Sequence, residues 1–331
     1  MINNPKISII IPTFNQGQFI EQTILSILNQ TYKNFEIIII DGGSKDNTIN
    51  IIKKHKTHLT YWISEKDSGQ SEAINKGIAK TTGDIITWLN SDDYYEPNTL
   101  EIIANNFIQS DSLAVVHGKA RLFGAKIKDK IIGLNSDIEI HQYLPFMRFP
   151  QPSSFYSKDA MRKLIPINED LHYAMDFEMI VKTVLLGSNV KRIDNLLSHY
   201  RIHENSKSNN DLSFLIEWTE VISRLFNSIP LGSFYNEELY QLSLIKSKSI
   251  LKYKIDIELN SKHLEEIFLS NLNLHYHYHY KALNYSTCKI ISDYLKTNYT
   301  TFYTENNYSK YNLRLKIIPI FILKFLRKIT R

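Results

Sequence analysis

Two adjacent carboxylates, Asp92 and Asp93, are the side chains of this sequence best suited to hold a divalent cation. They follow residues 85–89, an apolar run that predicts a buried strand, and an Asn-Ser pair that predicts a turn. Two like charges side by side are costly, and Mg²⁺ or Mn²⁺ relieves that cost because both ions prefer hard oxygen ligands. Such a cation can also hold the phosphates of a nucleotide. The residues alone leave open a simpler interpretation, a strand-to-helix turn with an Asp N-cap ahead of Pro97.

The segments around this pair alternate between two hydrophobic periods. Strands are predicted at residues 6–11, 35–40, 59–64, 85–89 and 113–117, and helices at 17–30, 44–54, 71–81 and after Pro97. Continuous apolar strands that alternate with helices predict an α/β protein with a mostly parallel, doubly wound sheet covered on both faces. In such sheets, ligands bind at the carboxyl ends of the strands.

Polar segments follow these strands in turn. They are Pro12-Thr13-Phe14-Asn15, Asp41-Gly42-Gly43-Ser44, Glu65-Lys66-Asp67-Ser68-Gly69 and Asn90-Ser91-Asp92-Asp93. We expect all of them to lie along one edge of the sheet. In this order they resemble the family 2 inverting glycosyltransferases, which have the GT-A fold, a Rossmann-like nucleotide-binding sheet flanked by helices. The resemblance extends over roughly residues 6–205.

The resemblance implies a nucleoside site along the first three of these segments. Thr13 and Asn15, in the loop that Pro12 opens, would contact the nucleoside. Asp41 would bind the uracil N3–H and the ribose, and Asp67 would be a second contact on the nucleoside side. The residues alone are also compatible with turns at both carboxylates, because Asp before Gly-Gly and Asp before Ser-Gly are typical turn sequences.

The resemblance places the cation and the diphosphate at the fourth segment. Asp92 and Asp93 would be the pair that holds the metal and the diphosphate, with Ser91 in the first position of the motif. His203 resembles a late His of related enzymes, and a neutral imidazole is a competent third protein ligand. A surface loop His is the alternative. Arg201 could neutralise charge on the leaving group or form a structural salt bridge.

A second polar cluster, at residues 151–155 and 173–178, lies where the family carries an acceptor-side carboxylate. Inversion requires an acceptor hydroxyl to attack the anomeric carbon opposite the leaving nucleotide, and a positioned carboxylate must take the hydroxyl proton. Asp176 is the residue that matches, with a helix-start Asp as the structural alternative. Glu178 is the other candidate base. Because two residues turn a helix by about 200°, both carboxylates cannot face one acceptor.

The composition is that of a globular protein of 331 residues, with 43% apolar and 22% charged residues. Its single cysteine, Cys288, excludes an internal disulfide framework and fits a reducing compartment. We expect neither a signal peptide nor a membrane-spanning helix, because no apolar run reaches about 20 residues. Residues 311–331 carry six Lys or Arg and no acid, which leaves −1 of the net charge of +5 for residues 1–310. A nearly neutral body argues against nucleic acid as a partner.

The basic tail, residues 311–331, predicts a contact with an anionic membrane surface. Pro319 can open a helix in which four cations share one face and apolar residues cover most of the remainder. Such a helix is too short to span a bilayer but can lie in the interface. The predicted location is therefore cytoplasmic, peripheral on the inner face of the cell membrane. A terminal helix docked on the protein's own core is the alternative.

We expect three parts: a GT-A catalytic domain at residues 1–210, with a nucleotide-sugar half at 1–117 and an acceptor half at 118–210, a mainly helical accessory region at 211–310, and the tail. The predicted function is metal-dependent, inverting transfer of a sugar from a nucleotide sugar, with a UDP-sugar favoured, to a hydroxyl of a polysaccharide or lipid-linked saccharide. One alternative is a nucleotidyltransferase that makes activated sugars, although it would need a Gly-rich, basic loop after the first strand. A catalytically inactive sugar-binding or scaffold module is the other.

Overall fold

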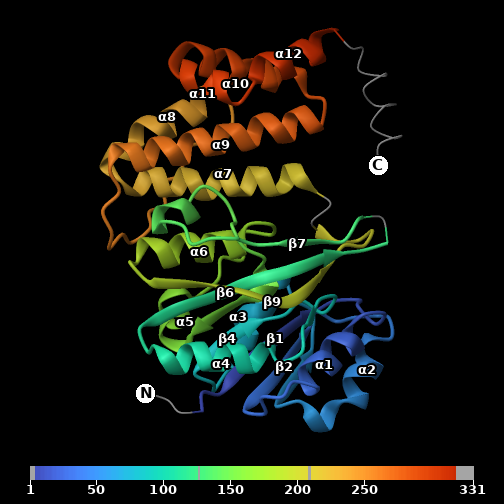
Figure 1. Ribbon diagram of the computed structural model, residues 1–331. Coiled ribbons are helices and arrows are strands. Elements are labelled where there is room, and N and C mark those ends of the chain that lie inside the picture. The colour runs from blue at the N-terminus through green and yellow to red at the C-terminus, as the bar shows by residue number, and fades with distance from the viewer. Residues whose placement is uncertain (1–3, 126, 208–209, 318–331) are drawn as a thin grey trace. The chain divides into compact units, whose positions relative to one another are not determined.

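The computed structural model describes residues 4–125, 127–207 and 210–317, with the backbone alone for 314–317 (Figure 1). The chain divides into two compact units. The first comprises residues 1–209 and 253–258, and the second comprises residues 210–252 and 259–331.

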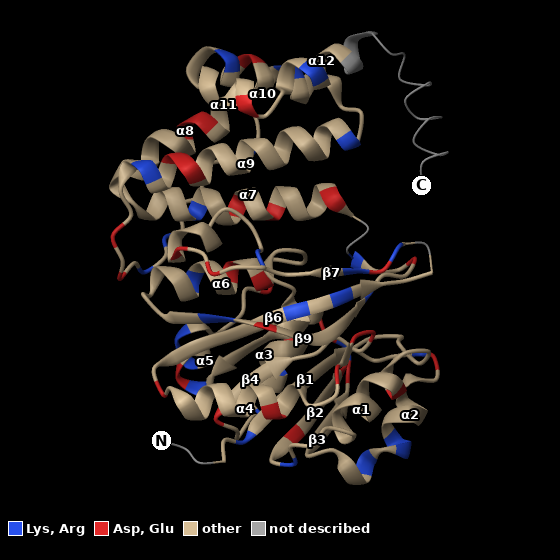
Figure 2. Cartoon of the chain, viewed as in Figure 1, with Lys and Arg blue, Asp and Glu red and all other residues tan. Residues whose placement is uncertain are grey.

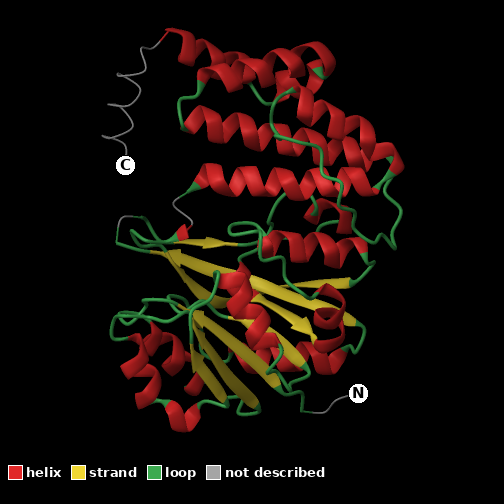
Figure 3. Cartoon of the chain, turned by 180° about the vertical axis from the view of Figure 1, so that it is seen from behind, coloured by secondary structure: helices red, strands yellow, loops and turns green. Residues whose placement is uncertain are grey.

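The first unit is built around a mixed sheet, which Figure 3 shows in yellow with helices in red. Among the described residues its strands run in the order β3-β2-β1-β4-β8-β6-β9-β5, with β7 paired to β6. The bounds are β1 Ile7–Thr13, β2 Phe35–Asp41, β3 Tyr61–Ser64, β4 Ile85–Trp88, β5 Tyr94–Tyr95, β6 Leu113–Phe123, β7 Lys130–Ile132, β8 Ser154–Ser157 and β9 Asn189–Arg201. Neighbours are parallel from β3 to β4 and between β6 and β9, whereas β8 runs antiparallel to both β4 and β6. The predicted α/β class is confirmed, but the sheet is mixed rather than mostly parallel because β5, β7 and β8 each pair antiparallel with their neighbours.

The strands of the parallel half are apolar on both faces because helices cover both faces. The helices of this unit are α1 Ile20–Leu28, α2 Thr48–Lys54, α3 Gln70–Ile78, α4 Thr99–Gln109, α5 Lys158–Leu164 and α6 Met175–Leu185. Helices α1, α2 and α4 share one hydrophobic core with Ile9 and Ile39. On the opposite face, Ala73 of α3 packs with Ile38 and Ile40. Both sets of strand residues are therefore buried, which explains the continuous apolar runs in the sequence.

Strand β6 continues beyond His117, where the sequence predicted its end. The apolar run stops there, but the pairing with β9 continues to Phe123 through a register shift around Gly118. A Cβ at Gly118 would lie only 2.7 Å from the backbone oxygen of Asn195, so the close approach of the two strands requires glycine at this position. The part of β6 beyond Gly118 carries basic residues, which are blue in Figure 2. Through its pairing with β9, this second half of β6 holds the end of β9 near the candidate site.

The second unit is helical, which confirms the predicted helical C-terminal region. Its helices are α7 Asp211–Ser228, α8 Ser233–Gln241, α9 Ser261–Lys281, α10 Tyr285–Asn298, α11 Thr300–Glu305 and α12 Tyr308–Ile317. Helix α9 contacts both α7 and α10 and lies between them (Figure 1). No described helix has the length and apolar character of a membrane span. Most of the predicted membrane-binding tail, from residue 318 onward, lies outside the described residues.

Candidate active site

The carboxyl ends of β1 and β2 lie side by side and begin the candidate site. Pro12 and Thr13 end β1, and Thr13 pairs in register with Asp41 at the end of β2. The amide of Gly42 donates to the Thr13 carbonyl at 2.9 Å. The Asp67 carboxylate lies against Gly42, with Oδ2 only 2.9 Å from where a Cβ of that glycine would be. The structure therefore brings the predicted nucleoside-side segments together at one edge of the sheet.

The loop after β1 is locked onto the loop after β2. Asn15 adopts a left-handed conformation with φ of 52°. Its amide donates to Ser44 Oγ at 2.7 Å, and its side-chain oxygen accepts from the amide of Lys45 at 2.8 Å. Asn15 thus stabilises the loop through its side chain. Its neighbour Phe14, which the sequence analysis did not single out, is 57% exposed and offers a ring face at the same edge. The signal that could have found it is a large aromatic residue inside a polar turn.

The two predicted nucleoside carboxylates have different surroundings. Asp41 is fully buried. Its Oδ2 atom accepts from Ser64 Oγ at 2.6 Å and from the amides of Ser44 and Gly43 at 3.0 and 3.1 Å, and its Oδ1 accepts from the Ser44 hydroxyl. Asp67 is only partly buried, and its pKa is raised by burial and by nearby negative charge. Asp41 therefore organises the loop after β2, while Asp67 presents a carboxylate beside it.

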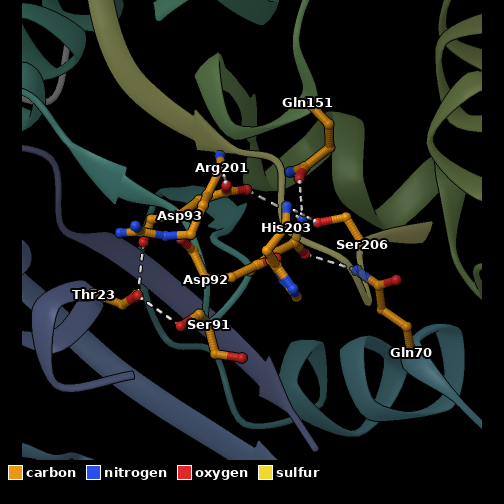
Figure 4. Close-up of polar contacts among 10 residues, drawn as sticks. Thr23, Gln70, Ser91, Asp92, Asp93, Gln151, Arg201, His203 and Ser206 are labelled. Atoms are coloured by element: carbon orange, nitrogen blue, oxygen red, sulfur yellow. Dashed lines mark hydrogen bonds and ion pairs between the residues drawn. The ribbon is translucent and has the colours of Figure 1, made fainter. Parts of the chain in front are cut away.

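The turn after β4 carries Asp92 and Asp93, whose side chains have separate partners (Figure 4). Asp92 Oδ2 lies 3.0 Å from His203 Nε2, and these side chains are 18% and 15% exposed. Asp93, which the sequence predicts as a metal ligand, is fully buried, and its Oδ1 accepts from the backbone amide of Arg201 at 2.9 Å. Its Oδ2 atom lies 3.4 Å from the side-chain nitrogen of Asn90. Burial, together with the charge of Asp92, raises the pKa of Asp93 well above its usual range.

Neighbouring elements hold this turn in place. The Thr23 hydroxyl of α1 donates to the carbonyls of Ser91 and Asp93 at 2.9 and 2.7 Å and so holds the backbone of this turn (Figure 4). Gln70, at the start of α3, donates to the side-chain oxygen of Asn90 at 2.7 Å. Sequence reasoning missed Thr23, because a Thr on the buried face of a helix carries no local signal of a contact with a distant turn.

The pair of Asp92 and His203 fits the donor set of a divalent cation. Asp92 Oδ2 and His203 Nε2 are 3.0 Å apart, which is the distance of a direct hydrogen bond. One or both side chains would have to turn for the two atoms to hold the same cation. Among the described residues, no group of three or more His, Cys, Asp or Glu is arranged to hold a metal. A cation here would therefore take its remaining ligands from a substrate diphosphate and water, which is common for Mg²⁺.

The predicted acceptor carboxylates lie in the first turn of α6. Asp176 is half-buried, and its Oδ1 accepts from the amide of Phe177 at 2.8 Å. Glu178 is buried, with Lys182 Nζ 3.0 Å from its Oε2 and Tyr253 Oη 3.0 Å from its Oε1. The structure thus gives the two carboxylates different surroundings, and Glu178 has partners within the fold.

Helix α3 links this region to the Asp92 turn. Ser71 Oγ lies 2.9 Å from the sulfur of Met175, the residue before Asp176. Asn75 exchanges two 2.9 Å hydrogen bonds with the backbone of Ile167. Because Gln70 of the same helix contacts the Asp92 turn, α3 connects the two groups of carboxylates.

A sheet flanked by helices, with carboxylates gathered at the carboxyl ends of its parallel strands, is the architecture of the GT-A class. The comparisons with known proteins agree with this class. Residues 8–163 match the model of the family described as glycosyl transferase family 2. An uncharacterized glycosyltransferase of Haemophilus influenzae is 32% identical over 263 residues, which are 76% of this chain and 100% of that protein. The chain belongs to glycosyl transferase family 2. It is therefore a glycosyltransferase, as predicted, rather than a nucleotidyltransferase.

Other relatives extend the comparison. The protein named poly(ribitol-phosphate) beta-N-acetylglucosaminyltransferase TarP, from Staphylococcus aureus, is 30% identical over 192 residues, 56% of this chain and 52% of that protein. The structure of S. aureus TarS 1–349 in complex with UDP-GlcNAc has a TM-score of 0.57 at 15% identity, covering 93% of this chain and 89% of that one. The mannosyltransferase PcManGT from Pyrobaculum calidifontis, in complex with GDP-Man and Mn²⁺, has a TM-score of 0.58 at 13% identity, covering 95% and 86%. These likenesses confirm the GT-A-like fold.

Proposed function

We propose that the protein transfers a sugar from a UDP-sugar to a hydroxyl of a saccharide or lipid-linked saccharide, with inversion at the anomeric carbon. The observation that carries this proposal is the 3.0 Å pairing of Asp92 with His203 next to the edge formed by Thr13 and Asp41. The relatives support a nucleotide-sugar donor, because one is named as an N-acetylglucosaminyltransferase and a structural neighbour holds UDP-GlcNAc.

The nucleoside would lie across the loops after β1 and β2. Phe14 offers an exposed ring for stacking on the base, and it is carried by a loop that Asn15 holds rigid. Asp67 is the carboxylate that solvent reaches at this edge, so it can accept hydrogen bonds from the base or the ribose. Asp41 would contribute by fixing the loop around Ser44. A base could approach Asp41 only at carboxylate oxygens that already accept hydrogen bonds from the protein.

The diphosphate would lie at Asp92 and His203, which together would hold Mg²⁺ or Mn²⁺. A bound cation would supply positive charge that offsets the charge developing on the leaving diphosphate. Asp93 would support this arrangement from the interior, since its carboxyl group accepts from the amide of Arg201. This assigns the ligand role to Asp92 and a supporting role to Asp93.

Asp176 would act as the general base. It would take the proton of the acceptor hydroxyl while that oxygen forms a bond to the anomeric carbon and the bond from this carbon to the diphosphate breaks, which releases UDP. Glu178 is the weaker candidate because its carboxylate is buried beside Lys182 and Tyr253. An acceptor oxygen that attacks from the face opposite the diphosphate gives inversion.

A screen of nucleotide sugars tests the donor site. We expect a UDP-sugar with MnCl₂ to raise the melting temperature of the full chain by several degrees, and EDTA to remove most of that rise. Asp92→Asn should abolish the stabilisation, whereas the control Asp159→Asn, at an exposed position of α5, should keep it. Stabilisation by GDP- or dTDP-sugars but not by UDP-sugars would overturn the assignment of uracil as the nucleobase of the donor. NMR of the product's anomeric proton tests inversion, and retained configuration would contradict it.

We further propose that the basic tail binds an anionic membrane surface and holds the protein at the inner face of the cell membrane. The support is the sequence of residues 318–331, in which four Lys or Arg alternate with apolar residues. Truncation after Ile317 tests this proposal. It keeps Asn312, which bonds to Ser292 and Tyr276 within the second unit. The truncated protein should float less with anionic vesicles than the full chain does. Equal flotation would exclude the tail as the contact.

A further inference from the structure

Arg201, the last residue of β9, contacts both the Asp92 turn and helix α1. Its Nε donates to the carbonyl of Asp92 at 2.9 Å, and its Nη2 donates to Oε1 of Gln22 at 2.7 Å. Its backbone amide donates to Asp93 Oδ1 at 2.9 Å. One residue therefore contacts both members of the carboxylate pair, once through the backbone and once through the side chain.

Aromatic rings enclose the same guanidinium. Its central carbon lies 4.6 Å from the ring centroids of both Phe19 and Phe123, and 5.9 Å from that of Tyr94. Rings at these distances attract a cation and restrict its orientation. The sequence left two roles open for Arg201, charge neutralisation on the leaving group and a structural salt bridge, and the structure adds this aromatic enclosure. Two of the five N–H donors of the guanidinium, at Nε and Nη2, are used within the protein.

One of the aromatic rings around Arg201 also contacts His203, the second side chain proposed to hold the cation. The ring of Phe19, which covers the guanidinium, lies with its centroid 4.9 Å from that of His203. His203 itself comes two residues after Arg201, and the amide between them, at Ile202, donates to Phe123 at 2.8 Å. Arg201 therefore contacts the backbone of Asp92, and Phe19 links its guanidinium to the ring of His203.

We propose that Arg201 is a positioning residue that sets the separation of the Asp92 carboxylate and the His203 imidazole, and thereby the affinity for a divalent cation. This inference rests on the proposed function, in which these two side chains bind the cation. Arginine is required because a planar guanidinium can donate from Nε in its own plane while rings cover its faces. A lysine keeps the charge and most of the length but has neither the plane nor the Nε donor.

The test is the affinity for Mn²⁺ in the presence of UDP, measured by calorimetry on the full chain. Arg201→Lys should weaken Mn²⁺ binding ten- to a hundredfold, as the loss of supporting contacts to metal ligands typically does. Phe19→Leu should weaken it in the same direction. The matched control is Arg192→Lys, on the same strand, where the guanidinium pairs with Asp137 and Asp194; Mn²⁺ affinity should be unchanged. Unchanged affinity in Arg201→Lys would overturn the proposal.

A measurement without metal separates this inference from the proposed function. In the metal-free protein, the shifts in melting temperature caused by Asp92→Asn and His203→Gln should be non-additive, because the two side chains are bonded. In the Arg201→Lys background this non-additivity should disappear. If the wild type binds no Mn²⁺ but this loss of coupling is observed, the cation role fails while the positioning role stands. If the coupling is the same in both backgrounds, the positioning role is wrong.

Discussion

Asp176 and Glu178 lie two residues apart on α6, yet only Glu178 is buried beside a lysine, with Lys182 Nζ 3.0 Å from its carboxylate. Asp176, half-buried at the start of the helix, presents its carboxylate in a different direction because two residues turn a helix by about 200°. In the proposed mechanism, Asp176 acts on the substrate proton and Glu178 stabilises the fold.

Asp176→Asn should remove the general base while leaving donor binding intact. We expect kcat to fall by a factor of about 10² to 10⁴, which is the usual contribution of a positioned base. The Kd for a UDP-sugar, measured by calorimetry, should change less than threefold. Glu178→Gln is the matched variant: it should retain most of the activity but unfold at a lower temperature, since it breaks the ion pair with Lys182. Full activity in Asp176→Asn would move the base to another residue.

His203→Gln should raise the Mn²⁺ concentration needed for half-maximal activity by at least tenfold. The imidazole lies 3.0 Å from Asp92, and an amide is a weaker ligand for the same ion. The measurement is a titration of MnCl₂ at saturating donor. His58→Gln, an exposed position after α2, is the control and should titrate like the wild type. If His203→Gln shows the wild-type requirement, the imidazole does not bind the cation.

Phe14→Ala should weaken donor binding without loss of stability. Stacking of a base on an aromatic ring is worth about 1–3 kcal/mol, so we expect the KM for the donor to rise roughly five- to a hundredfold. The melting temperature of the free protein should stay within about 1 °C, because the ring is 57% exposed. Phe14→Tyr retains the ring and should behave like the wild type. An unchanged KM in Phe14→Ala would place the base elsewhere.

His117 should make the first unit less stable in acid. Burial lowers the pKa of His117 to about 3, and the ring stacks on Phe149 at 3.9 Å and bonds to Tyr143 Oη at 2.9 Å. The unfolded chain takes up this proton near pH 6.5, so stability present above pH 6.5 is lost as the pH falls from 6.5 toward 3. The loss should be on the order of a few kcal/mol.

Thermal unfolding of His117→Phe between pH 7 and pH 4 checks this expectation. The variant should lose less stability than the wild type across that range, because it has no imidazole to protonate. It leaves the Tyr143 hydroxyl without its partner, which costs about 1 kcal/mol at every pH, so the slope with pH is the quantity to compare. His58→Gln should keep the wild-type slope. A His117→Phe variant with the same slope would show that another group causes the acid sensitivity.

Much of the fold could be predicted from local sequence. The strands β1, β2 and β4 are continuous apolar runs because both of their faces are buried, and each ends in a polar segment. Parallel strands put their carboxyl ends on one edge, so the meeting of Thr13 and Asp41 follows from the pattern. The reversed strand β8 could not be predicted in this way, because its direction depends on the pairing partners it finds in the sheet.

The sequence by itself determined the class of fold, the family and the acidic segments that form the site, because these depend on hydrophobic period and on short motifs. Only the tertiary structure decided which neighbours each acid has. It paired Asp92 with His203 across 111 residues and turned Asp93 into the interior. It also enclosed Arg201 between Phe19 and Phe123. Contacts of this kind depend on the direction in which each side chain leaves its turn or strand and on which residues pack against it. Neither can be predicted from the neighbouring residues in the sequence.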